Sequence, residues 1–176
     1  MLKRAIEEKI EEYLKGEAYK TFYIWGPRRS GKTTLLKKIS KRFKVPIFNF
    51  DYSSNRQMFI PDRATLEKLV AAHKIILIDE VQQFPEATVV FKILYDEFKV
   101  KVIATGSSEL RQKTSQEFDT MAGRFNEIYC LPLSISEIID NEKPKASEKM
   151  ELTKRLAEKA QIWGLYPEVY TKDTLS

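Results

Sequence analysis

Eight residues near the start of the chain, Gly26 to Thr33, have the types and spacing of a loop that binds phosphate groups. Their sequence, GPRRSGKT, matches the pattern G-x-x-x-x-G-K-[ST] at every fixed position. The glycines at 26 and 31 allow the backbone to turn tightly, so that successive N–H groups can surround an anion at the start of a helix. This chemistry predicts a site for a nucleoside triphosphate.

Each residue of the loop has an expected part in such a site. Lys32 is expected to reach the β- and γ-phosphates, and the Thr33 hydroxyl is expected to coordinate Mg²⁺. The remaining residues of the predicted nucleotide-binding set are Gly26, Pro27, Arg28, Arg29, Ser30, Gly31 and Thr34. Arg28 and Arg29 either strengthen the positive field at the phosphates or are solvated loop residues, and the sequence leaves both open. Thr34 is expected to support the start of the helix rather than the metal.

Two adjacent acids, Asp79 and Glu80, follow the apolar run 75–78. In P-loop NTPases an aspartate at a strand end helps to hold Mg²⁺, and Asp79 fits that role. Glu80 would then face the γ-phosphate, where it could polarise an attacking water as the catalytic base. An acidic turn after a buried strand is the alternative, which the upstream phosphate loop disfavours. No [NT]-K-x-D motif is present, so the sequence disfavours a GTPase.

A polar segment, Thr105-Gly106-Ser107-Ser108, follows the predicted strand 100–104. If this strand lies between the two motif strands, its tip reaches the γ-phosphate. Thr105 or Ser107 would then orient the water or sense the phosphate, and the sequence does not choose between them. Capping of a helix by Ser107 or Ser108 is an equal alternative.

Arg124 follows Ala122 and Gly123, just before another predicted strand. An arginine can stabilise charge in phosphoryl transfer, either in its own chain or in a neighbouring one. Taken alone, this is a weak indication, because most arginines are surface residues.

Strands that alternate with helices must position these residues. Strands are predicted over 21–25, 45–51, 75–78, 100–104 and 126–131, and helices over 1–14, 32–43, 62–72, 85–98 and after a polar linker at 142–147. A capping-box pattern at Ser134 and Glu137 predicts a further short helix. Strand–helix alternation predicts βαβ units and therefore a parallel sheet in an α/β fold.

The composition sets limits on the class of protein. The 176 residues are 43% hydrophobic and 31% charged, which suits one globular domain and argues against disorder. One cysteine and one histidine exclude an internal disulfide framework and a Cys/His zinc site. No uncharged stretch approaches the roughly 18 residues of a membrane helix, and the charged N-terminus does not match a secretory signal. We therefore expect a cytoplasmic protein with no membrane partner.

The positive charge is concentrated at the start of the chain. The net charge is +5, yet residues 1–50 alone hold 13 basic and 5 acidic residues, a net charge of +8. Part of this excess belongs to the phosphate loop, and the rest follows it on the helix at Lys37, Lys38, Lys41, Arg42 and Lys44. A solvated face is the favoured interpretation, and binding of DNA stays an alternative that no motif supports.

With these motifs in order, the chain resembles the AAA+-like P-loop ATPases of bacteria and archaea. The resemblance is carried by Gly26–Leu36, Asp79–Gln82, Thr105–Ser108, Ala122–Arg124, Pro132–Glu137 and Gly164–Val169. It implies a three-layer α/β fold with a parallel sheet in the strand order 5-1-4-3-2. It also implies binding of ATP and ADP and Mg²⁺-dependent ATP hydrolysis, and it makes Arg124 a catalytic candidate.

The resemblance has two departures and leaves three functions open. The family commonly has two glycines before the tyrosine, where this chain has Gly164-Leu165-Tyr166. Members usually continue into a C-terminal domain, so we expect an ATPase core over 1–140, with an N-terminal helix at 1–15, and a helical segment over 146–176 that begins a further domain. The expected function is ATP hydrolysis coupled to conformational change. An ATP-binding switch with negligible turnover and a nucleic-acid motor or loader subunit are the alternatives, and a homo-oligomer is compatible with each.

Overall fold

Five parallel strands form one sheet in the computed structural model, which describes residues 2–107 and 121–173. Neighbouring strands follow the order β2 (Ile47–Asn49), β3 (Ile75–Asp79), β4 (Lys101–Ser107), β1 (Thr21–Gly26) and β5 (Phe125–Tyr129). Every pairing between them is parallel. The predicted order 5-1-4-3-2 is confirmed, and β4 lies between the two strands that carry the phosphate loop and the acidic pair.

Helices connect the strands, and three more of the described helices come after the last strand along the chain. They are α1 (Ile6–Lys15), α2 (Lys32–Phe43), α3 (Ser53–Arg56), α4 (Arg63–Ala72), α5 (Ala87–Ile93), α8 (Ile135–Glu142), α9 (Ala146–Trp163) and α10 (Pro167–Asp173), with the short helical turns η1 (Gln57–Phe59), η2 (Val81–Gln83) and η3 (Leu94–Phe98). The predicted helix over 85–98 is divided between α5 and η3, where the backbone widens into a π-helical turn. The sequence did not predict α3, which is only four residues long, and it included α10 in the helical segment over 146–176 without giving it bounds of its own.

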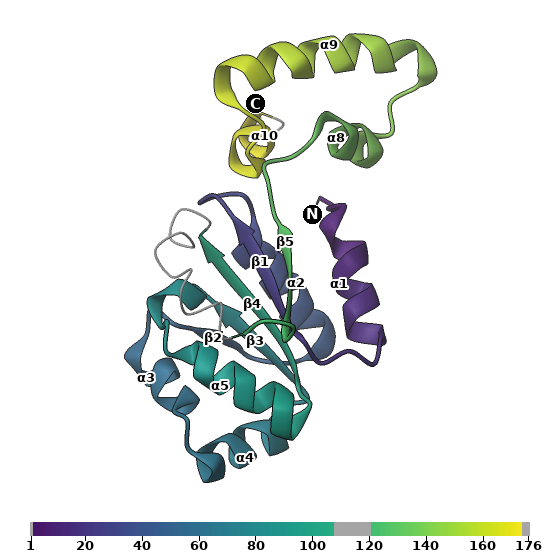
Figure 1. Cartoon of the computed structure of the whole chain (residues 1–176). Coiled ribbons are helices and arrows are strands. Elements are labelled where there is room, and N and C mark those ends of the chain that lie inside the picture. Colours follow the sequence, from purple (N-terminus) through teal and green to yellow (C-terminus); the bar gives the residue numbers. More distant parts are fainter. Residues whose placement is uncertain (1, 108–120, 174–176) are drawn as a thin grey trace.

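Helices cover both faces of the sheet, with α1 and α2 on one side and α4 and α5 on the other (Figure 1). The side chains of β1 alternate between these layers: Phe22 and Ile24 pack with α1 and α2, whereas Tyr23 and Trp25 pack with α4 and α5. All six residues of β1 are buried. A central parallel strand covered on both faces therefore has an uninterrupted apolar sequence.

Local capping fixes where two of the helices begin. The Asp62 side chain accepts a hydrogen bond of 2.8 Å from the Thr65 N–H, which makes Asp62 the N-cap of α4. Ser134 and Glu137 form a reciprocal capping box at the start of α8. The capping box at Ser134 and Glu137 agrees with the sequence pattern, because it depends only on residues three positions apart.

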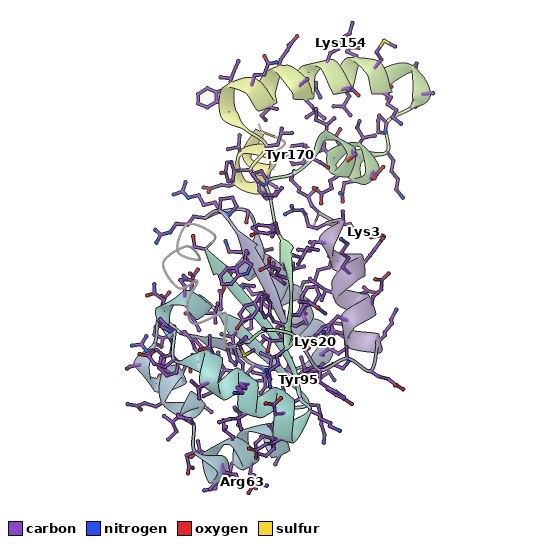
Figure 2. The ribbon with its side chains drawn as sticks, viewed as in Figure 1. Lys3, Lys20, Arg63, Tyr95, Lys154 and Tyr170 are labelled. Atoms are coloured by element: carbon purple, nitrogen blue, oxygen red, sulfur yellow. The ribbon has the colours of Figure 1, made fainter. Side chains whose placement is uncertain are left out.

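Helices α8, α9 and α10 form a separate small unit beyond the carboxyl-terminal edge of the sheet (Figure 1). Its core contains Leu133, Ile138, Leu152, Leu156, Leu165 and Tyr170. Figure 2 shows Tyr170 in this unit, at the opposite end of the molecule from Arg63 of α4. Helix α8 packs with α9 and contributes Ile138 to this core. Among the described residues, no helix is both long and apolar enough to cross a membrane.

Candidate nucleotide-binding site

The loop between β1 and α2 has the backbone shape that its glycines predict. Gly31 is the N-cap of α2 and has φ +101°, a conformation that residues with a side chain rarely adopt. A Cβ atom at Gly26 would lie 2.1 Å from the carbonyl oxygen of Cys130, so only glycine fits where β5 ends beside the loop. The first turn of α2 holds no acidic residue, which keeps the helix N-terminus favourable for an anion.

A cavity of about 810 Å³ opens over this loop. It is lined by residues from the loop and α2, from the acidic strand end, from the tip of β4 and from the two ends of the chain: Leu2, Arg4, Glu7, Arg28, Arg29, Gly31, Lys32, Thr33, Thr34, Leu35, Lys38, Asp51, Glu80, Gln83, Ser107, Pro167, Glu168 and Thr171. The volume lies within the usual range for a small-molecule site. The fold therefore brings the phosphate loop, Glu80 and Ser107 to one cavity.

Asp79 is the polar centre of this region. Its Oδ2 accepts a hydrogen bond of 2.8 Å from the Thr33 hydroxyl, and its Oδ1 accepts one from the Thr105 hydroxyl. Asp79 is only 3% exposed, and Thr105 is fully buried. The carboxylate is thus held between the first turn of α2 and β4, with both oxygens engaged.

The Lys32 side chain folds back against the backbone of the phosphate loop. Its ammonium group donates hydrogen bonds of 2.8 Å to the carbonyl oxygens of Gly26 and Pro27. The side chain is largely buried and also lines the cavity. A cation therefore sits within the curve of the loop, where the sequence predicts phosphate groups.

Thr105 and Ser107, which the sequence could not separate, have different surroundings. Ser107 comes two residues after Thr105 on β4. It lies opposite Gly26 in the parallel register and lines the cavity. Its hydroxyl is buried and has no hydrogen-bond partner among the described residues. Thr105 instead bonds Asp79 and lies outside the cavity lining. Ser108, the alternative cap, lies outside the described residues.

Glu80 stands beside Asp79 but faces different atoms. It lines the cavity, whereas Asp79 is turned into the sheet edge. Its backbone has φ +56°, in the left-handed region that residues other than glycine seldom occupy. The strained turn separates the directions of the two adjacent carboxylates.

Arg124 is not brought to this cavity. Its carbonyl oxygen accepts from the Thr21 N–H at the start of β1, which is the opposite end of the strand from the loop. The guanidinium Nε donates 3.0 and 3.2 Å hydrogen bonds to the two carboxylate oxygens of Asp96. A role for Arg124 at the site of its own chain is therefore incompatible with the fold, and a role in a neighbouring chain stays a prediction.

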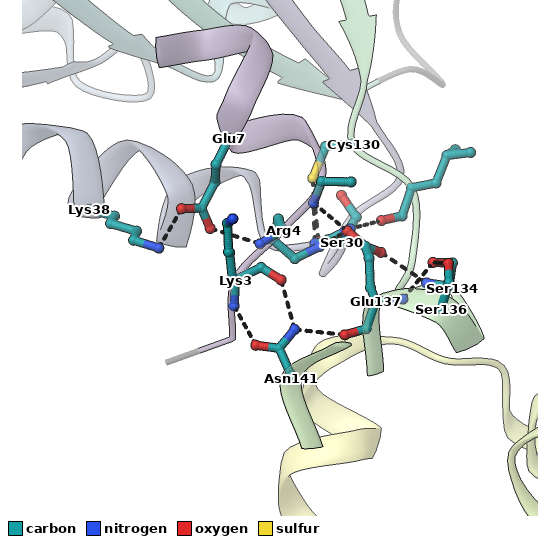
Figure 3. A network of polar contacts seen from close by, with 12 residues as sticks. Lys3, Arg4, Glu7, Ser30, Lys38, Cys130, Ser134, Ser136, Glu137 and Asn141 are labelled. Atoms are coloured by element: carbon teal, nitrogen blue, oxygen red, sulfur yellow. Dashed lines mark hydrogen bonds and ion pairs between the residues drawn. The ribbon is translucent and has the colours of Figure 1, made fainter. Parts of the chain in front are cut away.

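Arg4 contacts the phosphate loop, which the sequence did not predict. From just before α1, its guanidinium donates to the Ser30 carbonyl at 2.9 Å and to the Leu131 carbonyl at 2.6 Å, and it pairs with Glu137 at 3.0 Å. Figure 3 shows these contacts converging between the N-terminal segment, the phosphate loop and α8. No local pattern indicates these guanidinium contacts, because Ser30, Leu131 and Glu137 lie 26, 127 and 133 positions away from Arg4.

The Glu137 carboxylate balances Arg4 in this network. Burial by itself raises the pKa of Glu137, but hydrogen bonds from the Ser134 and Ala5 N–H groups and from Arg4 outweigh it and hold the pKa below its ordinary value. The side chains of Arg4 and Glu137 are only 11% and 12% exposed. Glu137 therefore serves two purposes, because it caps α8 and also orients the arginine that touches the loop.

The basic residues of α2 are partly neutralised by α1. Lys38 pairs with Glu7, and Arg42 pairs with Glu11 at 2.5 Å. Both acids come from α1, which packs alongside α2. These ion pairs fit the favoured interpretation of a solvated, charge-balanced face. Arg29 likewise lies 3.7 Å from Glu168 of α10, and both side chains are well exposed.

The donor set suits Mg²⁺ better than a transition metal. Thr33 and Asp79 offer hard oxygen ligands next to the predicted phosphate position, and Mg²⁺ is typically held by one or two carboxylates together with phosphate oxygens and waters. Within the described ranges, no group of three or more His, Cys, Asp or Glu side chains could hold a metal ion by itself. The buried Ser107 hydroxyl is a polar atom that a phosphate oxygen would satisfy.

A parallel sheet of this order, with a G-x-x-x-x-G-K-[ST] loop between β1 and α2, defines a P-loop NTPase. Residues 18–139 match the family model described as "AAA domain". The chain belongs to this family and contains an AAA-type ATPase domain.

Relatives and solved structures agree with this assignment. The chain is 30% identical over 125 residues to an uncharacterized protein of Methanocaldococcus jannaschii, covering 64% of this chain and 26% of that protein. It is 33% identical over 86 residues to the replication factor C large subunit of Sulfurisphaera tokodaii, covering 45% and 20%. The chain thus spans about a quarter or less of the length of these curated relatives.

Two solved structures share the fold. The Walker-type ATPase of Pyrococcus abyssi has a TM-score of 0.59 at 18% identity, covering 94% of this chain and 64% of that chain. AMPPCP-bound DnaA of Aquifex aeolicus has a TM-score of 0.51 at 16% identity, covering 93% and 62%. At these identities the likeness concerns the fold alone, so the chemistry has to be argued from this chain's own residues.

Proposed function

We propose that this domain binds Mg·ATP and hydrolyses it to ADP and inorganic phosphate. The observation that carries the proposal is the joining of the two motifs: Asp79 accepts a hydrogen bond from Thr33, while its neighbour Glu80 faces the cavity over the same loop. A merely acidic turn would not require an aspartate fixed to the phosphate loop. The AAA domain match over residues 18–139 supports the same reading.

Binding would fall to the loop and the first turn of α2. The backbone N–H groups after Gly26 and the Lys32 ammonium group would hold the β- and γ-phosphates, exchanging the two carbonyl contacts of Lys32 for phosphate oxygens. Thr33 and Asp79 would hold Mg²⁺, which when bound neutralises charge on the phosphates. Arg28 and Arg29 line the cavity and would add to its positive field.

Hydrolysis would use Glu80 as the base. Glu80 takes a proton from a water whose oxygen forms a bond to the γ-phosphorus. The bond from that phosphorus to the oxygen bridging the β- and γ-phosphates breaks, and ADP leaves with that electron pair. Ser107 lines the cavity and its buried hydroxyl has no partner among the described residues, so this hydroxyl would donate a hydrogen bond to a γ-phosphate oxygen. Thr105 would act through Asp79, since it bonds that carboxylate.

Coupling to conformational change would run through Arg4. This arginine touches the loop at the Ser30 carbonyl and α8 at Glu137, so a shift of the loop on nucleotide binding would reach the unit formed by α8, α9 and α10. We therefore divide the chain into an ATPase core over 1–140 and a C-terminal helical segment over 146–176 that responds to it, with α8 as their connection.

Phosphate release by the wild type and by Glu80→Gln tests the proposal. We expect the substitution to slow release by about 100-fold or more, because general base catalysis contributes on that order. ATP affinity should change little, since the amide keeps the size of the side chain. Glu86→Gln is the matched control, because Glu86 is an exposed acid outside the cavity lining. Lys32→Ala tests nucleotide binding separately, and this substitution should weaken the affinity for ATP.

Each alternative has its own outcome in this experiment. Equal, non-zero rates for the wild type and Glu80→Gln would remove Glu80 as the base. Tight ATP binding without release by either protein would favour the alternative function of an ATP-binding switch. If Lys32→Ala bound ATP as tightly as the wild type, the assignment of the phosphate loop itself would be wrong.

A further inference from the structure

Gln82 links the acidic strand end to the tip of β4. Its side-chain amide donates a hydrogen bond to Oε2 of Glu80, and its amide oxygen accepts a 3.2 Å hydrogen bond from the backbone N–H of Ser107. One side chain therefore connects the two cavity-lining residues that face the predicted γ-phosphate position. Neither the loop motif nor the paired acids explain this bridge.

The backbone on both sides is shaped to permit the bridge. The left-handed turn at Glu80 starts the η2 turn, in which the Gln83 N–H donates to the Glu80 carbonyl at 2.9 Å, and this returns Gln82 towards its neighbour two positions earlier. On β4, a Cβ atom at Gly106 would lie 2.8 Å from the amide oxygen of Gln82 and 2.5 Å from the Trp25 ring. Glycine at 106 thus lets Gln82 approach the strand.

The chemistry of an amide suits this position. A glutamine amide donates and accepts at the same time, so it can bond a carboxylate with its NH₂ group and a backbone N–H with its oxygen. A carboxylate held by a directed hydrogen bond has fewer rotamers than one in solvent. A base must lie within hydrogen-bond reach of the proton that it takes, and small errors of placement are costly.

We propose that Gln82 is a positioning residue for hydrolysis, which orients the Glu80 carboxylate towards the attacking water and holds it in register with Ser107. The inference rests on the proposed ATPase function. Because Gln82 does not line the cavity, it acts through Glu80 and should affect turnover rather than nucleotide affinity. If Gln82 had only a structural role, its loss would not lower turnover while leaving nucleotide affinity unchanged.

Gln82→Met tests the inference, because methionine keeps the length and apolar volume of the side chain while removing both hydrogen bonds. We expect turnover to fall by about tenfold or more, with the Kd for ATP unchanged within about threefold. In a Glu80→Gln background the same substitution should change the remaining turnover by less than about twofold, since both changes remove one function. Gln57→Met, at an exposed position in η1, is the matched control.

A second variant and a stability measurement separate a loss of positioning from a folding defect. Gln82→Glu keeps an acceptor for the Ser107 N–H, but it replaces the donor to Glu80 with a like charge, so it should lose at least as much turnover as Gln82→Met. Thermal unfolding of each variant checks that it is folded. A wild-type protein that hydrolyses ATP, with both variants turning over at its rate, overturns the role of Gln82 alone. Lack of turnover by the wild type instead overturns the proposed function.

Discussion

The Thr33 hydroxyl and the Asp79 carboxylate are joined by a hydrogen bond of 2.8 Å, although the residues lie 46 positions apart in the chain. The bond fixes the first turn of α2 to the end of β3, which are the two elements that carry the motifs. Thr105 engages the other Asp79 oxygen, so the carboxylate has a defined orientation. Two side chains with oxygen atoms of the kind that Mg²⁺ prefers are thereby held together beside the phosphate loop.

Thr33→Val should remove the magnesium dependence of ATP binding. Valine preserves the shape of threonine but lacks the hydroxyl that would coordinate the ion and that bonds Asp79. We expect the strengthening of ATP affinity by Mg²⁺ to fall by about tenfold or more, in line with the loss of an oriented ligand. Calorimetric titration with ATP in Mg²⁺ and in EDTA measures the effect. Thr33→Ser, which retains the hydroxyl, is the control, and equal magnesium dependence in Thr33→Val and the wild type would contradict the assignment.

The sequence predicted the parts of the site that depend on neighbouring residues. The loop from Gly26 to Thr33 and the acids Asp79 and Glu80 at the end of β3 are contiguous motifs, and their glycine and strand-end requirements are local. The choice between Thr105 and Ser107 was not predictable, because it depends on the register of β4 against β1 and on which hydroxyl Asp79 engages.

Contacts between distant segments account for what the sequence missed. Arg4 reaches the Ser30 carbonyl only because α1 packs beside α2, and nothing in the residues around it indicates this. Arg124 shows the opposite error. Its position in a shared motif suggested a catalytic role, but the chain places it where β5 begins, at the opposite end of the sheet from the loop. Motif order alone therefore cannot tell which edge of a parallel sheet a residue will occupy.

Arg124→Met should leave ATP binding by the same chain unaltered. Because Arg124 pairs with Asp96 away from the cavity, we expect the Kd for ATP to stay within about twofold of the wild type. The free energy of unfolding should fall by at most about 1 kcal/mol, since the pair is partly exposed. Nucleotide titration and urea unfolding measure the two quantities.

An affinity loss in Arg124→Met as large as that of Lys32→Ala would show that the arginine reaches its own site after all. A role in a neighbouring chain makes a separate prediction. Turnover per chain would then rise with protein concentration in the wild type, and it would not rise in Arg124→Met.

Glu137→Gln should remove part of the pH dependence of stability. The pKa of Glu137 is held below its ordinary value of 4.5 in the folded chain, because hydrogen bonds from backbone N–H groups and from Arg4 outweigh the effect of burial. A carboxyl group with a lowered pKa stabilises the fold fully above its unfolded pKa, and this contribution is lost as the pH falls through the folded pKa. At pH 7 the free energy of unfolding of the wild type should therefore exceed that of Glu137→Gln by about 2 kcal/mol, which is the scale of hydrogen bonds to a charged group.

Urea unfolding between pH 7 and pH 3 measures this difference. We expect the gap between the wild type and Glu137→Gln to be constant down to about pH 5 and to narrow below the ordinary glutamate pKa, because protonation then removes the same charge from the wild type. Glu158→Gln, at an exposed acid on α9, should show no comparable gap. A difference that persisted unchanged at pH 3 would mean that Glu137 stabilises the fold by packing rather than by its charge, and Arg4 would then not be held to α8 through an ion pair.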